Sequence, residues 1–306
     1  MQQEQYHIPV MLDECMEGLD IKPDGVYIDL TFGGGGHSKA IIQRLSEKGS
    51  LYAFDQDSDA IKNALDDERF TMIEDNFSNL TNQLKLYRVT QVDGILADLG
   101  ISSYQIDCAE RGFSTRFDAE LDLRMNRKQI LTAKDVVNTY SYEQLKKIFS
   151  DFGELSNAHQ IAKKIESLQI EGISTTTQLK EILQPLAQRG KENKFFAQVF
   201  QALRIEVNGE IDVLKKMLEQ TSPLLKKGGR LVVMSYHSLE DRLVKNYMKA
   251  GNCEGKVEKD FFGNVLNDLE LVNRKPITAS QEELERNPRS RSAKLRIAQK
   301  KVGDEG

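Results

Sequence analysis

Residues 26–55 read VYIDLTFGGGGHSKAIIQRLSEKGSLYAFD. This stretch holds two short runs rich in β-branched and aromatic residues, 26–32 and 50–54, which is the composition of buried strands. Between them lie four consecutive glycines and a helical pattern of apolar residues that stops at Gly49. A strand, a glycine loop, a helix and a second strand in this order predict one βαβ unit of a parallel sheet.

The alternation continues toward residue 100. We expect a short helix at 57–65, a third strand at 70–73, a helical stretch at 77–86 and a fourth strand at 92–99. Short apolar strands that alternate with helices are typical of an α/β fold with a mostly parallel sheet, the Rossmann-like class.

The pattern then changes to apolar residues at helical spacing, with almost no strand signal from 103 to 203. The strand pattern returns at 230–234, and a strand of this buried character needs a sheet to join. We therefore expect one α/β domain, residues 1–102 and 204–306, interrupted by an inserted helical domain, residues 103–203. Two domains in sequence are the alternative. Beyond residue 234 we expect a helix from Leu239, a hairpin within 256–272 and a last strand at 293–298.

The composition excludes several classes of protein. The chain has 306 residues, of which 39% are hydrophobic and 29% charged, which is typical of a globular protein. No stretch approaches 18 apolar residues, so no membrane-spanning helix is expected, and residues 1–5 lack the features of a secretory signal. The three cysteines lie far apart, which argues against a disulfide framework or a thiolate zinc site and fits a reducing cytoplasm.

Charge is distributed unevenly along the chain. Residues 1–102 carry 8 basic and 18 acidic side chains, whereas residues 103–306 carry 34 basic and 29 acidic ones. From Arg286 to Lys301 there are seven basic residues and no acidic one. Such a run can bind phosphate although the net charge of the whole chain is −5. The alternative is a solvated basic tail that only aids solubility.

The glycine run directly after a strand predicts a site for a cofactor that contains a nucleoside. Glycine lets the backbone approach a ligand closely at the start of a helix. Asp55 follows Gly35 by about 20 residues, the spacing at which an acid binds ribose hydroxyls.

Three cofactors compete for this loop. A nicotinamide dinucleotide requires GxGxxG, which fails in both registers because residues 38 and 39 are Ser and Lys. A P-loop requires a Gly-Lys-Ser or Gly-Lys-Thr ending, which this loop lacks. S-adenosylmethionine has no pyrophosphate, needs only a looser glycine loop with the ribose acid, and fits best. A tight turn without a ligand is the remaining alternative.

Two further segments follow strands of the same predicted sheet. Asp98 ends the strand at 92–99, and Ser235, Tyr236 and His237 follow the strand at 230–234. Ligands of open α/β sheets bind at the carboxyl ends of the strands. Asp98 is expected to contact the methionyl part of the cofactor or the amine that receives the methyl group, and its alternative role is a helix cap or turn residue. His237 is either a packed, hydrogen-bonded histidine or a site residue.

Nine segments occur in an order that resembles a known family: HIPVM (7–11), TFGGGGHS (31–38), FDQD (54–57), ADLGISSYQID (97–107), ERGFS (110–114), LDLRM (121–125), FQALRIEVN (200–208), SYHSLEDR (235–242) and NPRSRSAKLR (287–296). Together they resemble the bacterial ribosomal small-subunit methyltransferase H family over nearly the whole chain. The resemblance implies a class I S-adenosylmethionine-dependent methyltransferase fold with an inserted helical domain. It also implies methylation of the exocyclic 4-amino group of a cytidine in the decoding region of 16S rRNA. Carried over position by position, it implies cofactor contacts at Gly35, Gly36, His37, Asp55, Phe77, Asp98 and Gln105.

Such a reaction asks mainly for alignment of amine, methyl carbon and sulfur in one line, because the sulfonium is already a good leaving group. The lone pair of the amine is delocalised into the cytosine ring, so a hydrogen-bond acceptor at the amine would help it react. Amino methyltransferases of DNA often carry a double proline after the fourth strand, where this chain has Leu99 and Gly100. The acceptor is therefore left open between Asp98 and the turn that holds Tyr236 and His237. We expect no metal ion, since the reaction needs none.

The expected partner is 16S rRNA within the 30S subunit or its precursor, in the cytoplasm and away from membranes. Phosphate contacts are expected from the inserted domain and from the basic run, at Arg289, Arg291, Lys294 and Arg296. A homodimer is left open. Three functions remain distinct hypotheses: the rRNA cytidine methyltransferase, a class I methyltransferase of a protein or another RNA, and a non-catalytic adenosyl-binding scaffold.

Overall fold

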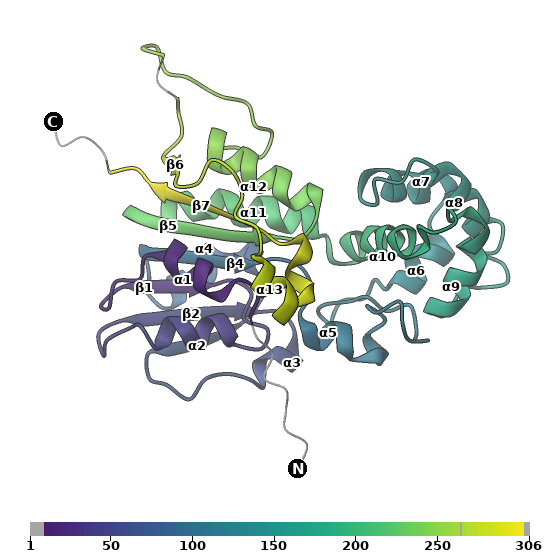
Figure 1. The fold of residues 1–306 in the computed structure, drawn as a ribbon, viewed down its shortest axis with the longest axis horizontal. Helices are drawn as coiled ribbons and strands as arrows, with labels where there is room; N and C mark the ends of the chain where they lie inside the picture. Colours follow the sequence, from purple (N-terminus) through teal and green to yellow (C-terminus); the bar gives the residue numbers. More distant parts are fainter. Residues whose placement is uncertain (1–8, 264, 303–306) are drawn as a thin grey trace. The chain divides into compact units, whose positions relative to one another are not determined.

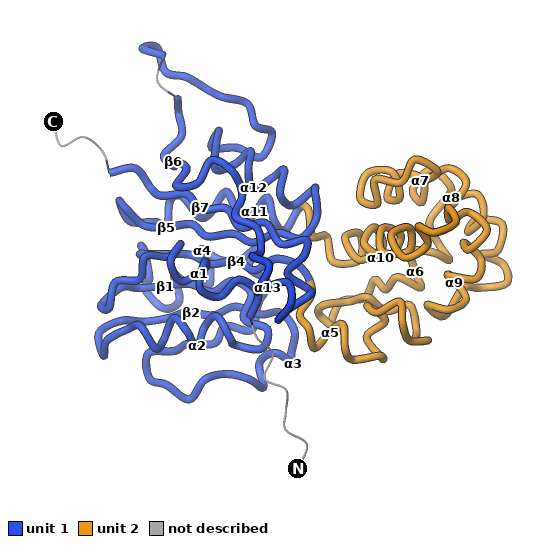
Figure 2. The backbone as a smooth tube through the Cα atoms, viewed as in Figure 1, with its two compact units in different colours: residues 1–100, 212–306 blue, residues 101–211 orange. Residues whose placement is uncertain are grey.

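We describe residues 9–263 and 265–302 of a computed structural model of the chain (Figure 1). Residues 1–5, His7 and Ile8, which entered the sequence predictions, lie outside the described residues, as does residue 264 of the expected hairpin. The chain divides into two compact units, residues 1–100 with 212–306 and residues 101–211 (Figure 2). The second unit ends beyond residue 203 because helix α10 (Glu192–Asn208) runs through that position and ends at Gly209, which has the left-handed conformation (φ 59°).

The first unit contains a seven-stranded sheet of order β3-β2-β1-β4-β5-β7-β6. The strands are β1 (Val26–Asp29), β2 (Ser50–Asp55), β3 (Phe70–Glu74), β4 (Val92–Asp98), β5 (Leu225–Ser235), β6 (Leu269–Leu271) and β7 (Lys294–Lys300). Strands β1 to β5 are parallel, whereas β7 runs antiparallel to both β5 and β6. Strands β1 and β5 both pair with β4, which confirms that the runs at 26–32 and 230–234 belong to one sheet and that the fold is α/β.

Helices cover both faces of this sheet, as Figure 1 shows. One face packs against α1 (Leu12–Leu19) and α2 (Gly36–Ile42). The other packs against α4 (Leu80–Leu86), α11 (Glu210–Leu224) and α12 (Ser238–Ala250). Within β4, Leu96 packs in the hydrophobic core under α1 and α2, whereas Ile95 and Ala97 pack in the core under α4, α11 and α12. The strand is therefore buried on both faces. This burial is why its sequence is nearly continuous in apolar residues.

The remaining short elements of the first unit lie in its connections. They are α3 (Ser58–Ile61), the 3₁₀ turns η1 (Phe77–Asn79) and η4 (Pro288–Ser292), and α13 (Gln281–Arg286). Of the described helices, none is long and apolar enough to cross a membrane.

The second unit is helical and has a hydrophobic core of its own, which includes Phe149, Ile161 and Val199. Its elements are α5 (Ser103–Asp107), η2 (Ala109–Arg111), α6 (Ala133–Thr139), α7 (Tyr142–Asp151), α8 (Ala158–Glu166), α9 (Thr176–Leu183), η3 (Gln184–Leu186) and α10. The Ser141 side chain accepts from the Gln144 N–H and the Gln144 side chain accepts from the Ser141 N–H, so α7 begins with a capping box.

Two expected elements differ from the structure. Strand β5 begins at Leu225, ahead of the run at 230–234 that the sequence predicted, and therefore includes Gly228 and Gly229. Gly228 has a positive φ of 78°, and the register of β5 against β4 shifts between Val92 and Gly94, so the glycines form an irregularity inside the strand. The expected hairpin at 256–272 contains, in its described part, one isolated bridge, and β6 pairs with β7 instead.

Candidate active site

The glycine loop joins the end of β1 to the start of α2. Gly33 and Gly35 have positive φ angles of 52° and 75°, a conformation that favours glycine. A Cβ at Gly35 would lie 2.8 Å from the Phe32 ring, whereas a Cβ at Gly34 would meet nothing within 4 Å. The loop is thus packed on the Phe32 side and open at Gly34, which fits a ligand that approaches the backbone closely.

Asp55, at the end of β2, fixes this loop. One carboxylate oxygen accepts a hydrogen bond from the Gly33 N–H at 2.8 Å, and the other accepts one from the Asp57 N–H at 2.9 Å. Burial raises the pKa of Asp55 to about 6, although these two bonds act in the opposite direction. A carboxylate offers about four acceptor positions, so this one retains capacity for ribose hydroxyls. The sequence predicted that Asp55 binds the ribose, but not that Asp55 also accepts a hydrogen bond from the glycine loop.

The ends of β1 and β4 lie side by side, at the point where the order of the strands reverses. The Asp98 N–H donates to Thr31 Oγ1 at 2.7 Å, and the buried Asp29 accepts from Ser38 Oγ at 2.7 Å. Burial raises the pKa of Asp29, against the effect of the nearby His37. The sequence analysis did not include Asp29 among the site residues. A carboxylate inside an otherwise apolar strand is the sequence feature that could have indicated it.

The side chain of Asp98 is directed to the strand end of β5. Its Oδ1 accepts a hydrogen bond from the Tyr236 hydroxyl at 2.8 Å, and its Oδ2 lies 3.9 Å from His37 Nδ1. Burial raises the pKa of Asp98 to about 6, opposed by His37 and by the Tyr236 bond. Burial and the Asp98 charge also raise the pKa of Tyr236, so the hydroxyl keeps its proton and remains a donor. The structure thus brings together Asp98, Tyr236 and His37.

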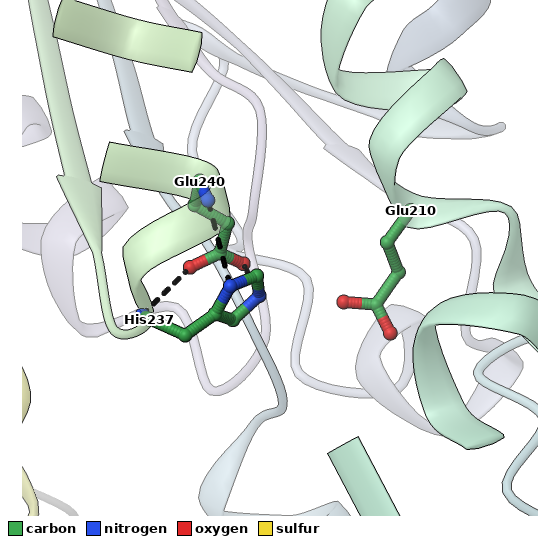
Figure 3. Close-up of side chains that lie close together, drawn as sticks. All are labelled: Glu210, His237 and Glu240. Atoms are coloured by element: carbon green, nitrogen blue, oxygen red, sulfur yellow. Dashed lines mark hydrogen bonds and ion pairs between the residues drawn. The ribbon is translucent and has the colours of Figure 1, made fainter. Parts of the chain in front are cut away.

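His237 holds the turn that presents Tyr236. It is the N-cap of α12, where its Nδ1 accepts from the Glu240 N–H at 3.4 Å. Glu240 in return accepts from the Tyr236 N–H at 2.9 Å, and its other oxygen lies 3.1 Å from His237 Nε2 (Figure 3). Both side chains are almost fully buried. Nδ1 thus caps the helix, as in the packed alternative for His237, whereas the buried Nε2 forms no hydrogen bond among the described residues. A role of His237 in the reaction stays a prediction.

Figure 3 also labels Glu210, which belongs to the second unit. There its carboxylate accepts two hydrogen bonds from the Arg204 guanidinium, at 2.8 and 2.9 Å. The two bonds form a bidentate ion pair within the second unit.

The two remaining expected cofactor contacts are Phe77 and Gln105. Phe77 is the first residue of η1, which follows β3. Its side chain is partly buried and packs against the hydrophobic core that includes α4. Gln105 lies in the second unit, where it is buried and forms a capping box with Ser102 at the start of α5. Their contact with the cofactor stays a prediction.

The basic run divides into residues with different surroundings. Arg296 lies in β7 with a side chain only 8% exposed, and its Nε donates to Asp241 Oδ1 at 2.7 Å. Lys294 lies 3.3 Å from the same carboxylate. Although burial of Asp241 acts to raise its pKa, the bond from Arg296 lowers it, which is the behaviour of a stable ion pair. We therefore withdraw Arg296 as a phosphate contact, because its guanidinium is buried and paired inside the fold. Arg289 and Arg291 lie in η4.

Strand order, a glycine loop after the first strand and an acid at the end of the second together define a class of protein. It is that of the class I S-adenosylmethionine-dependent methyltransferases, as the sequence predicted. The model of the MraW methylase family matches residues 4–301, and the chain belongs to that family. S-adenosylmethionine is its methyl donor.

Relatives support this membership along the whole chain. The chain is 55% identical over 297 residues to the "Ribosomal RNA small subunit methyltransferase H" of Phocaeicola vulgatus, covering 97% of this chain and 98% of that protein. It is 54% identical to the protein of the same name from Christiangramia forsetii, with the same coverage. Among solved structures, an rRNA methylase from Streptococcus thermophilus gives a TM-score of 0.38 at 14% identity, covering 95% of this chain and 93% of that chain. So distant a likeness adds nothing to the assignment.

Proposed function

We propose that the protein methylates the exocyclic 4-amino group of a cytidine in the decoding region of 16S rRNA, within the 30S subunit or its precursor. The observation that carries the proposal is the hydrogen-bonded pair of Asp98 and Tyr236, next to the glycine loop at the switch point of the sheet. The name shared by the relatives, which are 54–55% identical, supports a ribosomal RNA substrate.

In this proposal the glycine loop and Asp55 bind the adenosine part of the cofactor. When bound, S-adenosylmethionine supplies a methyl group activated by its positively charged sulfur. The protein then needs only to hold the amine in line with that methyl group. Gly34 offers open backbone for the approach, and Asp55 offers its remaining acceptor positions to the ribose.

Asp98 is the proposed acceptor at the amine. The amine nitrogen becomes positively charged as it forms its new bond to carbon, and one N–H proton must then leave. The Asp98 carboxylate accepts one hydrogen bond from Tyr236 and has further acceptor positions for the amine N–H. A carboxylate held in place by a partly buried tyrosine needs little reorganisation when the charge develops.

The rate should therefore depend on the ionisation of Asp98. Its pKa is raised to about 6, so above this pH the carboxylate is charged and can accept, whereas below it the protonated form cannot. We expect kcat to rise about tenfold per pH unit up to about pH 6 and then to level off. The measurement is kcat at saturating S-adenosylmethionine, which keeps the titration of Asp55 in cofactor binding out of the profile. A flat profile between about pH 5 and pH 8 would exclude Asp98 as the acceptor.

RNA binding is proposed for the helical unit and for the basic run. The phosphate contacts of the run are Lys294, whose side chain is 42% exposed, and the two arginines of η4, Arg289 and Arg291. Replacing both arginines with Ala should weaken binding to 30S subunits and reduce the salt dependence by about one to two counterions, because phosphate contacts release counterions. Affinity at two salt concentrations measures this. The matched control replaces Lys48 and Lys85, two exposed lysines of the same unit, with Ala. Equal affinity and slope in both double variants would leave the helical unit as the leading candidate.

Labelled S-adenosylmethionine and 30S subunits test the reaction itself. Methylated cytidine in the 16S rRNA is the expected product. Label in a protein or in another base would support a different methyltransferase, and cofactor binding without transfer would support a non-catalytic scaffold. The cytoplasm as the location and the homodimer stay predictions, and sedimentation of the purified protein tests the latter.

A further inference from the structure

The segment of residues 9–11 packs on the first turn of α2. A Cβ at Gly36 would lie 2.2 Å from Pro9 Cγ, so the pyrrolidine ring occupies the space of a side chain there. The next residue, Val10, offers its carbonyl oxygen to His37 Nε2 at 3.1 Å. The position of this segment therefore sets where the backbone of Gly36 and His37 lies, at the point where the glycine loop enters its helix.

The segment is itself held by Glu283, which is 272 residues away in the sequence. The Met11 N–H donates to Glu283 Oε1 at 3.1 Å, in a buried bond. Met11 is fully buried and has a left-handed backbone (φ 50°), and no side chain caps α1 at this position. This conformation is strained for a residue other than glycine. The bond to Glu283 is an interaction that holds Met11 in it.

The Glu283 carboxylate does not complete a capping box at the start of its own helix, α13. The Ser280 hydroxyl caps α13 by accepting from the Glu283 N–H at 3.1 Å, and Ser-x-x-Glu is the pattern of a reciprocal capping box. The Glu283 carboxylate is instead directed to Met11 and to the guanidinium of Arg286, with only 3% of the residue exposed. A buried carboxylate used in this way serves the distant segment and not only the local helix.

We propose that Glu283 is a positioning residue for cofactor binding, which acts through Met11, Val10 and Pro9 on Gly36 and His37. The inference rests on the proposed cofactor site at the glycine loop. Without the Glu283 oxygen, the buried Met11 N–H lacks its acceptor and the segment shifts to reach water. Val10 and Pro9 move with it, and the start of α2 loses the contacts that hold it in place for the cofactor.

Three variants separate this role from a general effect on folding. Glu283→Met keeps the volume and removes the acceptor, Glu283→Gln keeps an acceptor oxygen, and Glu282→Met changes an exposed residue of the same helix. By calorimetry, Glu283→Met should bind S-adenosylmethionine about tenfold more weakly, because a buried N–H has lost its partner. Glu283→Gln should recover most of the affinity and Glu282→Met should equal the wild type. At saturating cofactor, kcat on 30S subunits should stay at the wild-type value in all three.

Wild-type affinity in Glu283→Met, or equal losses in the Met and Gln variants, would overturn the inference. If Glu283→Met does not fold, Glu283→Asp replaces it, since it keeps the charge for Arg286 but withdraws the oxygen from Met11. A raised KM for S-adenosylmethionine with unchanged kcat then supports the role, and an unchanged KM overturns it. Asp55→Ala serves as the reference: wild-type cofactor affinity in that variant would mean that the proposed cofactor site itself is wrong. Weakened binding in Asp55→Ala but not in Glu283→Met would reject only the role of Glu283.

Discussion

Replacing Asp98 with Asn should lower kcat by about 10²- to 10⁴-fold, the range for losing a catalytic proton acceptor. The variant keeps the size of the side chain and an oxygen for the Tyr236 hydroxyl, which donates to Asp98 at 2.8 Å. It loses the negative charge that stabilises the positive charge developing on the amine. Single-turnover transfer of a labelled methyl group to 30S subunits measures the effect.

Two further variants make this test specific. Tyr236→Phe removes the hydrogen bond to Asp98 and should lower kcat by about tenfold, since the carboxylate is then less well positioned. Asp93→Asn changes an acid at the opposite end of β4, where it accepts from the Val26 N–H and pairs with Lys226, and it should leave kcat unchanged. If Asp98→Asn raised the dissociation constant of the cofactor and kept kcat, Asp98 would instead bind the methionyl part.

Replacing Asp55 with Ala should weaken S-adenosylmethionine binding by roughly 1.5–3 kcal/mol, the range for hydrogen bonds to a charged group. The carboxylate has two tasks, because the oxygen that holds the Gly33 N–H at 2.8 Å also fixes the loop. Asp55→Asn keeps an oxygen for Gly33 and should therefore bind better than the Ala variant. Calorimetry of the folded variants gives the dissociation constants.

The matched control for Asp55 is Asp66→Ala, which removes an exposed acid from the connection between β2 and β3. It lowers the negative charge of the unit by the same amount, so a general electrostatic effect would appear in both variants. Unchanged affinity in a folded Asp55→Ala variant would remove Asp55 from the cofactor site.

The sequence determined the elements of the sheet because their signals are local. Strands β1 to β4 lie where apolar and β-branched runs predict them, and Gly33 and Gly35 have the positive φ angles that favour glycine. The capping box that opens α7 depends on residues three positions apart. Such signals can be read without knowledge of the rest of the chain.

The environment of the basic run was decided by the tertiary structure. In β7, alternate residues face opposite sides of the sheet, and the pairing of Arg296 with Val233 of β5 directs Arg296 to Asp241 of α12. A shift of one residue in that register would turn the guanidinium to the other face. The sequence showed only seven basic residues among positions 286–301. The tertiary structure separates the buried Arg296 of β7 from Arg289 and Arg291 of η4.

The same distinction applies to the candidate site. Sequence alone identified the glycine loop, Asp55, Asp98 and Tyr236, because each directly follows or ends a recognisable strand and the motifs resemble a family. The hydrogen bond from Tyr236 to Asp98 joins residues 138 positions apart, and the bond from Met11 to Glu283 joins residues 272 apart. Pairs of this kind depend on which strands are neighbours and on how the helices pack on them. Local patterns of residue types do not show either of these. Local sequence patterns therefore predict which groups lie at the carboxyl edge of the sheet, whereas the contacts among those groups follow from strand order and helix packing.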